Sequence, residues 1–467
     1  MHSSFFGLEI AKKALFAQQR VQENISHNVA NANTPGYSRQ RVVLESSYIS
    51  PNTVMPGIGQ LGTGVSVSDV TRIRDTFADM QFRHEFSSLG EWGLQSDILR
   101  QVEMVFNEPS DIGISSVLTQ FWRSLEELAK TPESLEVREM VKERAVTLSS
   151  TINHAATQLS QIIDDINFRI SVNVNEVNTI ATQIAELNGQ IERLEITGIT
   201  ASDLRDKRDV LLDELAQLVN FNSYEDENGQ FSINVGGALL VKGANHDGFT
   251  FDKNDSPAVI KWKSYGTPVN ISSGELKGMM ELRDQKVQGY LDRLAVFAST
   301  FAQKFNEIHR NGFDLNGNQG GNFFKDSQNL APYELIAVDQ DILSDIGRIA
   351  AAGNKDGIPG DNTNALELAG IKSRHFNEIS GTFDDYYGSL ISKIGIDSQE
   401  AGRMANSQEF IVSQLDQRRK STSGVSLDEE MAKMVMHQHA YTAAARVITA
   451  VDQMIDTIVN KMGIVGR

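Results

Sequence analysis

The chain opens with a predicted amphipathic helix, because apolar or small residues recur every three or four positions at Leu8, Ala11, Leu15, Ile25 and Val29. This spacing places them on one helix face, which can pack on a partner. Glutamines interrupt the face twice. An isolated helix would therefore be marginal, and we expect it to gain order from its neighbours.

The chain closes with a second segment of the same kind. Ser426 and Glu429 stand at capping-box spacing where it begins. Its apolar stripe crosses a few polar positions and includes Met434, Tyr441, Ile448, Ile455 and Val459. A monomer must pair the two terminal helices with each other or leave them frayed.

A turn is predicted to end the first helix. The tetrapeptide TPGY at 34–37 stops it, because proline disfavours the helical conformation of the residue before it. Proline followed by glycine also suits the two central positions of a type II turn. Asn31 and Asn33 tolerate the unusual backbone angles of a helix exit. Residues 40–75 then form an extended connector.

The middle of the chain is predicted to be mainly helical. Two helices lie within residues 78–130, and the next restarts at Thr131-Pro132 with proline in the first position. From about Leu148 to Leu194 one apolar stripe continues over about twelve turns, which is typical of a coiled coil. Further helices are predicted at 203–219, about 274–309 and about 364–421, the last broken at Gly381 and Gly395.

One interval within the middle differs from this pattern. Residues 220–275 are predicted to form a small β module, because Phe231, Ile233 and Val235 alternate after Asn228-Gly229. The predicted fold class is therefore mainly α with a small β module and long, coiled-coil-like helices.

Charge and composition narrow the possible partners. The net charge of −18 argues against nucleic acid, whose binding rests on neutralising phosphates. Both ends are nearly neutral, and the middle carries about −19, as a solvated body between association-prone termini would. The absence of cysteine excludes disulfides and thiolate metal sites. No apolar run is long enough for membrane insertion, and Glu9 argues against a secretory signal peptide, so any export needs another route.

The motifs that resemble catalytic or metal sites are incomplete. Gly57-x-Gly59-x-x-Gly62 lacks the preceding strand and following helix of a dinucleotide loop, so we interpret it as turns. His84-Glu85 lacks the second histidine of a zinc protease motif. Asp314 begins a calcium-like run that lacks the required glycine and glutamate, which favours an Asx turn. We expect no catalytic residue, no metal and no cofactor, and no enzyme activity.

Several segments together resemble one known family. NISHNVANANTPGYSRQRV is similar to the amino-terminal signature of flagellar rod, hook and hook-associated proteins, and its PGYSRQ ending resembles the FlgK family of hook-associated proteins. GTGVSVSDVTRIRDTF, DLRDKRDVLLDELAQLV, FNEIHRNGFDLNGNQGGNFF and SGVSLDEEM resemble further segments of that family in the same order.

The resemblance implies a structural component of the bacterial flagellum at the junction between hook and filament. Members form a ring of like subunits between hook protein and a second hook-associated junction protein. They pass through the flagellar type III exporter, so they are transiently cytoplasmic and then extracellular. An export chaperone would hold the C-terminal helix.

The resemblance also implies domains and site residues. The terminal helices would pair as an axial domain of residues 1–60 plus 425–467, disordered or frayed in the monomer. A helical body would comprise 61–219 plus 276–424, with 220–275 as an outer β-rich module. The assembly motif would be Asn28, Asn31, Asn33, Thr34, Pro35, Gly36, Tyr37, Ser38 and Arg39. The axial-helix interface would be Leu8, Leu15, Ile25, Val29, Met434, Tyr441, Ile448, Ile455 and Val459.

Some alternatives stay open from the sequence. Tyr37, Arg39 and Arg41 can contact either an adjacent subunit or their own connector. The chain can also be another flagellar axial protein, such as a hook, rod or second junction protein. From a different class, it can be a secreted coiled-coil enzyme or binding protein whose site lies in residues 220–275.

Overall fold

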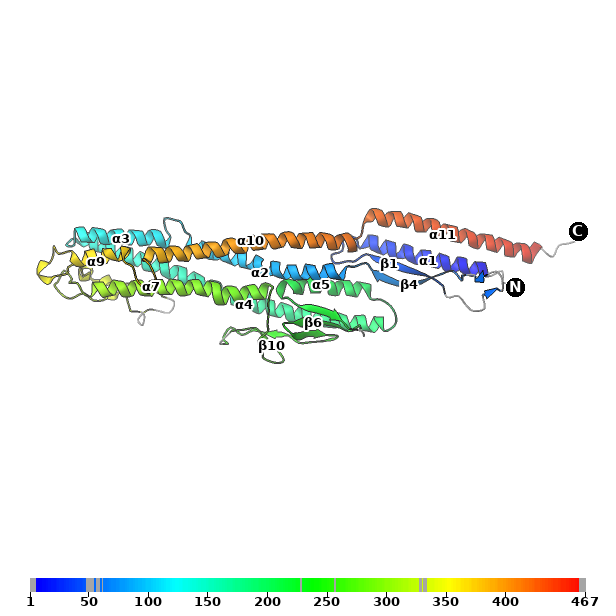
Figure 1. Cartoon of the computed structure of the whole chain (residues 1–467), viewed down its shortest axis with the longest axis horizontal. Helices are drawn as coiled ribbons and strands as arrows, with labels where there is room; N and C mark the ends of the chain where they lie inside the picture. The colour runs from blue at the N-terminus through cyan, green and yellow to red at the C-terminus, as the bar shows by residue number, and fades with distance from the viewer. Residues whose placement is uncertain are drawn as a thin grey trace.

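The protein is an elongated assembly of long helices, with both described ends of the chain at one end of the molecule (Figure 1). The computed structural model describes residues 6–47, 54–55, 59–60, 62–226, 229–255, 258–326, 330 and 334–461. The turns predicted at Gly57 to Gly62 lie largely outside these residues, as does Asn228. Among the described residues, no helix combines the length and apolarity needed to cross a bilayer.

The terminal part contains two antiparallel helices, α1 (Phe6–Ala30) and α11 (Leu427–Asp456), which lie side by side. A short π-helix, Thr457–Lys461, continues α11. Strands β1 (Gln40–Ser46) and β4 (Val65–Arg72) pair antiparallel and pack on α1, with a register shift between Val43 and Leu44. The predicted extended connector is thus confirmed as a β ribbon over residues 40–46 and 65–72.

The body is built from long helices that share one continuous apolar core. They are α2 (Thr76–Phe106), α3 (Ile114–Lys130), α4 (Leu135–Glu195), α5 (Ser202–Leu218), α7 (Gln288–His309) and α10 (Phe383–Ser423). The stripe predicted on α4 is buried almost throughout, against α3, α7 and α5 in turn. Only its last member, Leu194, is exposed.

The β module lies on the flank of α4 (Figure 1). Four antiparallel strands run in the order β5 (Asn222–Glu225), β6 (Phe231–Val235), β7 (Ala238–Lys242) and β8 (Asn245–His246). A separate pair joins β9 (Phe249–Thr250) to β10 (Lys261–Trp262). Buried Ile233, Val241 and Trp262 join the core of the body.

Short elements complete the chain. Helix α6 (Glu275–Glu281) continues through a π-helical segment, Leu282–Val287, into α7. Short strands β2 (Val54–Met55) and β3 (Gly59–Gln60) pair with each other. Helices α8 (Gln340–Ser344) and α9 (Thr363–Gly370) and the 3-10 turns Ile346–Arg348, Lys355–Gly357 and Ile371–Ser373 lie at or near the end of the molecule opposite the termini.

The far end is held by buried polar side chains. The His309 ring contacts the Gly321 carbonyl through Nδ1 at 2.8 Å and accepts from the Ala350 amide through Nε2 at 2.9 Å. Burial lowers the pKa of His309 from 6.5 to about 4, so the ring is neutral at pH 7. Asp314 accepts from the amides of Asn316 and Asn318, as the predicted Asx turn requires.

Two predicted helix boundaries were wrong. Pro132 does not begin α4, because Ser134 is the N-cap, with its hydroxyl accepting from the Val137 amide. Gly395 does not break α10, which continues from Phe383 to Ser423. The packing of α10 along α2 outweighs the modest helix propensity cost of one glycine.

Candidate functional site

The predicted assembly motif surrounds one buried side chain, Asn28 near the end of α1. Its amide nitrogen donates to the Gln40 carbonyl and to a Glu430 carboxylate oxygen, both at 2.9 Å. Its amide oxygen accepts from the Gln40 amide at 3.0 Å and from the Tyr37 hydroxyl at 2.8 Å. Asn28 and Glu430 are each only 1% exposed. One side chain thus joins α1, β1 and the first turn of α11.

The turn that follows has the predicted type II character. The Tyr37 amide donates to the Thr34 carbonyl at 3.2 Å, and Gly36 has a φ of +75°. A Cβ atom at Gly36 would overlap the Val210 side chain on α5. Glycine is therefore required both for the backbone angle and for the close approach to the body.

The other motif residues divide into two groups. Asn31 donates to the His27 carbonyl at 3.0 Å and accepts from the Thr34 hydroxyl at 3.2 Å, which closes the end of α1. Asn33, Thr34, Pro35 and Gly36 are exposed. Tyr37 is half-buried and contacts His27 edge-to-face, and burial raises its pKa. Part of the motif, Asn31 and Tyr37, therefore makes contacts within the chain, and the other part, residues 33–36, forms an exposed surface.

Ser38 and Arg39 connect the motif to both the body and α11. The buried Ser38 donates its amide to Asp206 at 3.0 Å and accepts from Arg74 at 3.1 Å. Arg39 forms an ion pair with Glu429 at 2.9 Å, and its amide donates to the Ser423 carbonyl at 2.8 Å. Tyr37 and Arg39 thus contact their own chain, while Arg41 is exposed.

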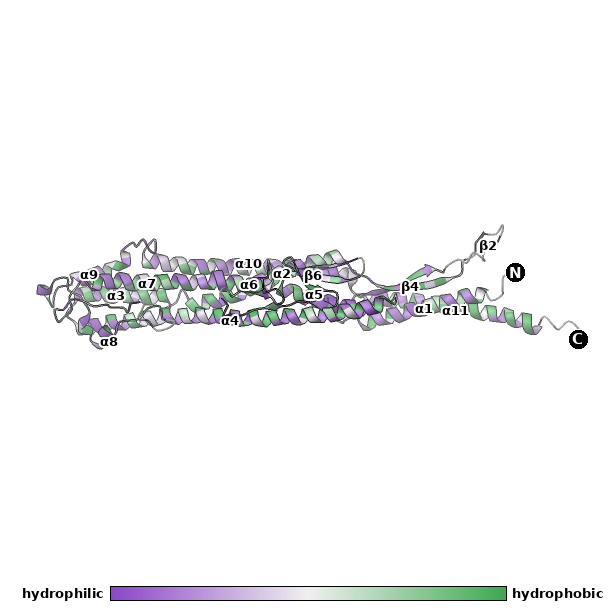
Figure 2. Ribbon diagram, turned by 90° about the horizontal axis from the view of Figure 1, so that it is seen from below, coloured by the Kyte–Doolittle hydropathy of each residue, from purple (hydrophilic) through white to green (hydrophobic). Residues whose placement is uncertain are grey.

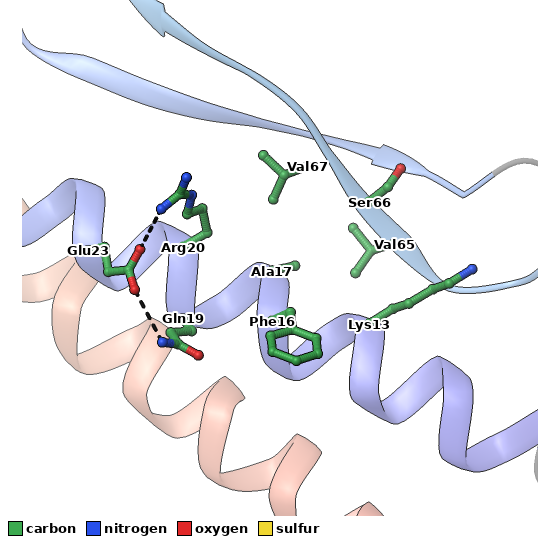
Figure 3. Close-up of a pocket in the computed structure, with 9 residues that line it drawn as sticks. All are labelled: Lys13, Phe16, Ala17, Gln19, Arg20, Glu23, Val65, Ser66 and Val67. Carbon is green, nitrogen blue, oxygen red and sulfur yellow. Dashed lines mark hydrogen bonds and ion pairs between the residues drawn. The ribbon is translucent and has the colours of Figure 1, made fainter. Parts of the chain in front are cut away.

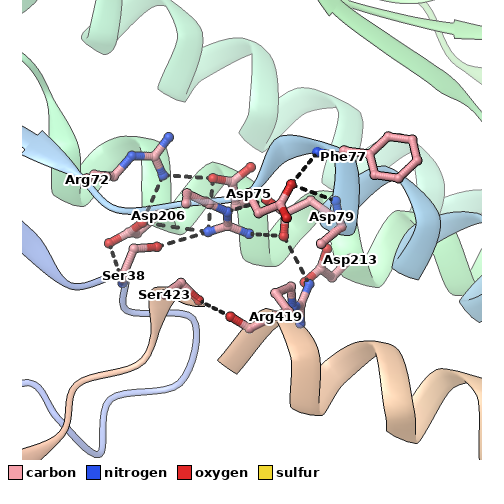
Figure 4. A network of polar contacts seen from close by, with 12 residues as sticks. Ser38, Arg72, Asp75, Phe77, Asp79, Asp206, Asp213, Arg419 and Ser423 are labelled. Carbon is pink, nitrogen blue, oxygen red and sulfur yellow. Dashed lines mark hydrogen bonds and ion pairs between the residues drawn. The ribbon is translucent and has the colours of Figure 1, made fainter. Parts of the chain in front are cut away.

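Beneath the motif lies a dense group of ion pairs that the sequence reading missed (Figure 4). We call it the joint cluster. It joins β4 and the residues that follow it to α2, α5 and α10, where the terminal part meets the body. Its members are Arg72, Arg74, Arg83, Arg419, Asp79, Asp206, Asp209 and Asp213.

Short contacts connect the joint cluster in a chain. Arg72 Nη1 lies 2.8 Å from both Asp206 and Asp209. Arg74 binds Asp79 at 2.6 Å and Asp209 at 3.2 Å. At the opposite edge, the guanidinium of Arg419 binds Asp213 at 2.6 Å and stacks 3.9 Å from the centre of the Phe82 ring.

The joint cluster keeps its charges. Burial alone raises the pKa of Asp209, but the charges of Arg74, Arg83 and Arg72 outweigh burial and lower that pKa to about 2. Removing one partner of such a pair leaves an uncompensated charge, which typically costs about 3–5 kcal/mol. The cluster therefore fixes the terminal part on the body. A signal was present in the sequence, since Asp206, Asp209 and Asp213 fall on one face of α5.

The predicted axial-helix interface residues lie mostly between α1 and α11. Ile25 is buried and packs in a cluster with Val29 and Met434. Leu8, Leu15, Tyr441, Ile448 and Ile455 are half-buried. Val459, in the π-helical extension, is 70% exposed. The structure also buries Ala17 and Val21, which the predicted face omits. The β1–β4 ribbon covers that side of α1.

Helix α11 has a second apolar face that the sequence reading did not identify. Six positions alternate in steps of four and three, at Met436, Ala440, Ala443, Val447, Ala450 and Met454. Ala440 is half-buried and the others are exposed. Apolar positions continue along α11 beyond the body (Figure 2). Within the described residues nothing covers this face, which we call the outer seam.

The described residues contain no group of three or more histidine, aspartate or glutamate side chains placed to hold a metal ion. The site is instead a set of helix faces, a turn and ion pairs. Such an arrangement positions segments of protein relative to one another.

Comparisons with known proteins agree with these features. A family model described as "Flagellar hook-associated protein FlgK helical domain" matches residues 99–324. Models described as "Flagella basal body rod protein" and "Flagellar basal body rod FlgEFG protein C-terminal" match residues 8–37 and 417–462. The two rod-protein matches fall on the terminal helices and the motif.

Two relatives that match over nearly their whole length are both named flagellar hook-associated protein 1. The chain is 35% identical to flagellar hook-associated protein 1 of Bacillus subtilis over 100% of both chains. It is 25% identical to flagellar hook-associated protein 1 of Escherichia coli, over 96% of this chain and 98% of the relative.

A solved structure shares the fold. The flagellar hook junction protein FlgK from Burkholderia pseudomallei matches with a TM-score of 0.65 at 15% identity. The match covers 74% of this chain and 100% of the solved chain. With the full-length identity to the Bacillus protein, these findings show that the chain belongs to the flagellar hook-associated protein 1 (FlgK) family.

Proposed function

We propose that this chain is a structural component of the bacterial flagellum that forms the junction between hook and filament, and that it is not an enzyme. The family membership supports the flagellar role. The single structural observation that carries the proposal is the pairing of α1 with α11, fastened by Asn28 and Glu430, with the outer seam of α11 left exposed.

Assembly through the terminal part explains why this seam is apolar. An apolar stripe with steps of four and three is the pattern by which helices pack on one another. Burial of each large side chain on it would contribute about 1.5–3 kcal/mol. Copies of the chain would form a ring through these helices. The hook protein would contact one side and a second hook-associated junction protein the other.

The proposal includes the route by which the chain reaches the flagellum. It would be transiently cytoplasmic, leave through the flagellar type III exporter and end outside the cell. An export chaperone would hold the C-terminal helix before export. The domain division of residues 1–60 plus 425–467, 61–219 plus 276–424, and 220–275 is part of the same proposal, with the β module outermost in the assembly.

Substitutions on the outer seam test the proposal. Val447→Asp combined with Met454→Asp should leave the body folded, because both side chains are exposed in the single chain. Filament attachment should be lost, because two carboxylates cannot be buried between helices. The matched control is Thr449→Asp with Gln453→Asp, at exposed polar positions of the same helix.

The readouts are circular dichroism of the purified chain and the fraction of hooks that carry filaments. Immunolabelling of intact flagella should show one band between hook and filament. Normal filament attachment by the seam variant would contradict the assignment of this face. Label spread along the filament would contradict the junction role.

A further inference from the structure

The connection between α4 and α5 exposes large apolar side chains in a firmly held turn. We call residues 194–199 the α4–α5 tip. Leu194 is 43% exposed, Ile196 is 79% exposed and Ile199 is 63% exposed. Three large apolar side chains exposed within six residues are unusual for a surface turn. Such exposed apolar patches mark interaction sites.

Polar contacts hold the tip in one conformation. Arg205 binds Glu195 through two contacts of 2.6 and 2.7 Å, and it binds Glu225 at 2.8 and 3.0 Å. The Thr200 hydroxyl lies 3.0 Å from Asp69 on β4. Gly198, with a φ of +79°, closes the turn. The apolar side chains are therefore presented by a rigid support, which lowers the entropy cost of docking.

A groove on the terminal part has complementary properties (Figure 3). It lies between α1 and β4, has a volume of about 490 Å³, and is lined by Phe16, Ala17, Val65 and Val67. Lys13, Arg20 and Glu23 also line it, and the last two pair with each other at 2.9 Å. Phe16 is 56% exposed there. We call this the α1–β4 groove.

The charges at the two surfaces are also complementary. Lys13 borders the groove and bonds only to the uncharged Ser47 hydroxyl and Thr63 carbonyl. Lys12 lies over the Phe16 ring and has no ion pair among the described residues. Glu192, in the last turn of α4, likewise has no ion pair in the described part of the chain. The neighbouring Arg193 projects about 100° away around the helix.

We propose that the α4–α5 tip of one copy docks in the α1–β4 groove of a second copy. Ile196 and Ile199 would enter the apolar part of the groove, and Glu192 would approach Lys13 at its rim and Lys12 beside the Phe16 ring. This contact would join the body of one subunit to the terminal part of the next. It rests on the proposed function, because it needs copies side by side in an assembly, and it is separate from the outer seam of α11.

The cysteine-free sequence permits a direct test. Ile196→Cys and Phe16→Cys are made in separate full-length chains and produced together in flagellated cells that lack the native protein. Isolated hook–filament junctions are then oxidised, and disulfide-linked dimers are measured on a denaturing gel. We expect a dimer only when both variants are present. A matched control replaces Phe16→Cys by Tyr265→Cys, which is 72% exposed on the β module, and should give no dimer.

The outcomes separate this inference from the proposed function. Junctions that contain both variants but give no mixed dimer would overturn the docking and leave the junction role standing. Dimers of Ile196→Cys alone would also overturn it, since they place two tips together. Absence of both variants from flagella would overturn the proposed function and the docking with it.

A second measurement does not depend on cysteine chemistry. Ile196→Asp should weaken the contact between subunits roughly tenfold or more, because the new carboxylate must be desolvated in the groove. Self-association of the full chain at high concentration is measured by analytical ultracentrifugation. The control Ile112→Asp changes an isoleucine of similar exposure, 72% against 79%, at another place in the body. Equal association of both variants would overturn the docking.

Discussion

We predict that Asn28→Asp releases α11 from α1, because Asn28 contacts Glu430 on α11. The substitution keeps the shape of the side chain but removes both N–H donations, to Gln40 and to Glu430. It also places a second carboxylate against the buried Glu430. Each buried acceptor oxygen that loses its donor costs about 1–3 kcal/mol, and the like charges add to this cost, while Glu430 keeps its ion pair with Lys433 at 2.7 Å. We expect a loss of about 3–4 kcal/mol in the local stability of the terminal pair.

Hydrogen exchange measures this loss where it occurs. A change of 3–4 kcal/mol should speed exchange of the first turns of α11 by roughly 10²–10³, while α4 should be unaffected. Asn33→Asp is the matched control, because Asn33 belongs to the same motif but is exposed. The reasoning is refuted if Asn28→Asp leaves exchange of residues 427–437 unchanged. It is refuted equally if the unaltered chain shows no protection there.

Three further predictions follow from other contacts. Gly36→Ala should lower the free energy of unfolding by roughly 1–3 kcal/mol in thermal melts, whereas Gly93→Ala, in open space within α2, should raise it slightly. The unfolded chain binds a proton at His309 below pH 6.5 and the folded chain only below about 4. The free energy of unfolding should therefore fall by up to about 3 kcal/mol as the pH is lowered from 6.5 to about 4, as measured by urea titrations. His309→Gln should flatten this pH dependence, whereas His84→Gln, at an exposed position, should leave it unchanged. Arg419→Met should destabilise the chain by about 2–4 kcal/mol in the same titrations, because Asp213 keeps only Arg83 of its two arginine partners and Phe82 loses the guanidinium stacked on it. Arg418→Met at an exposed position should change little. An equal effect of Arg418→Met would contradict a specific role for the joint cluster.

Local and periodic features were predictable from the sequence. The stripe on α4 from Leu148 to Ile191 gave its long buried face, because a helix repeats its surface every 3.6 residues. The type II turn at Pro35-Gly36 and the N-cap at Ser426 were likewise correct, since a turn and a cap depend on neighbouring residues, although α1 already ends at Ala30.

Features that depend on distant residues were not predictable from one sequence. Arg72 and Asp206 are 134 positions apart, and Asn28 and Glu430 are 402 apart. No local pattern states that such residues meet. The outer seam of α11 was not predicted for a different reason. Half of its positions are alanines, which give a weaker apolar pattern than the larger residues of the face toward α1. The assembly roles of both faces stay predictions.

The pairing of the two chain ends has a consequence for the order of folding. Closing a flexible loop of about 400 residues costs roughly 5 kcal/mol of chain entropy, and the single contact between Asn28 and Glu430 cannot offset it. A folded body removes that cost, because α2, α5 and α10 meet at the joint cluster and bring residues 72 and 423 close together. The terminal pair should therefore form last. Until it does, its apolar faces stay accessible to whichever protein meets them first.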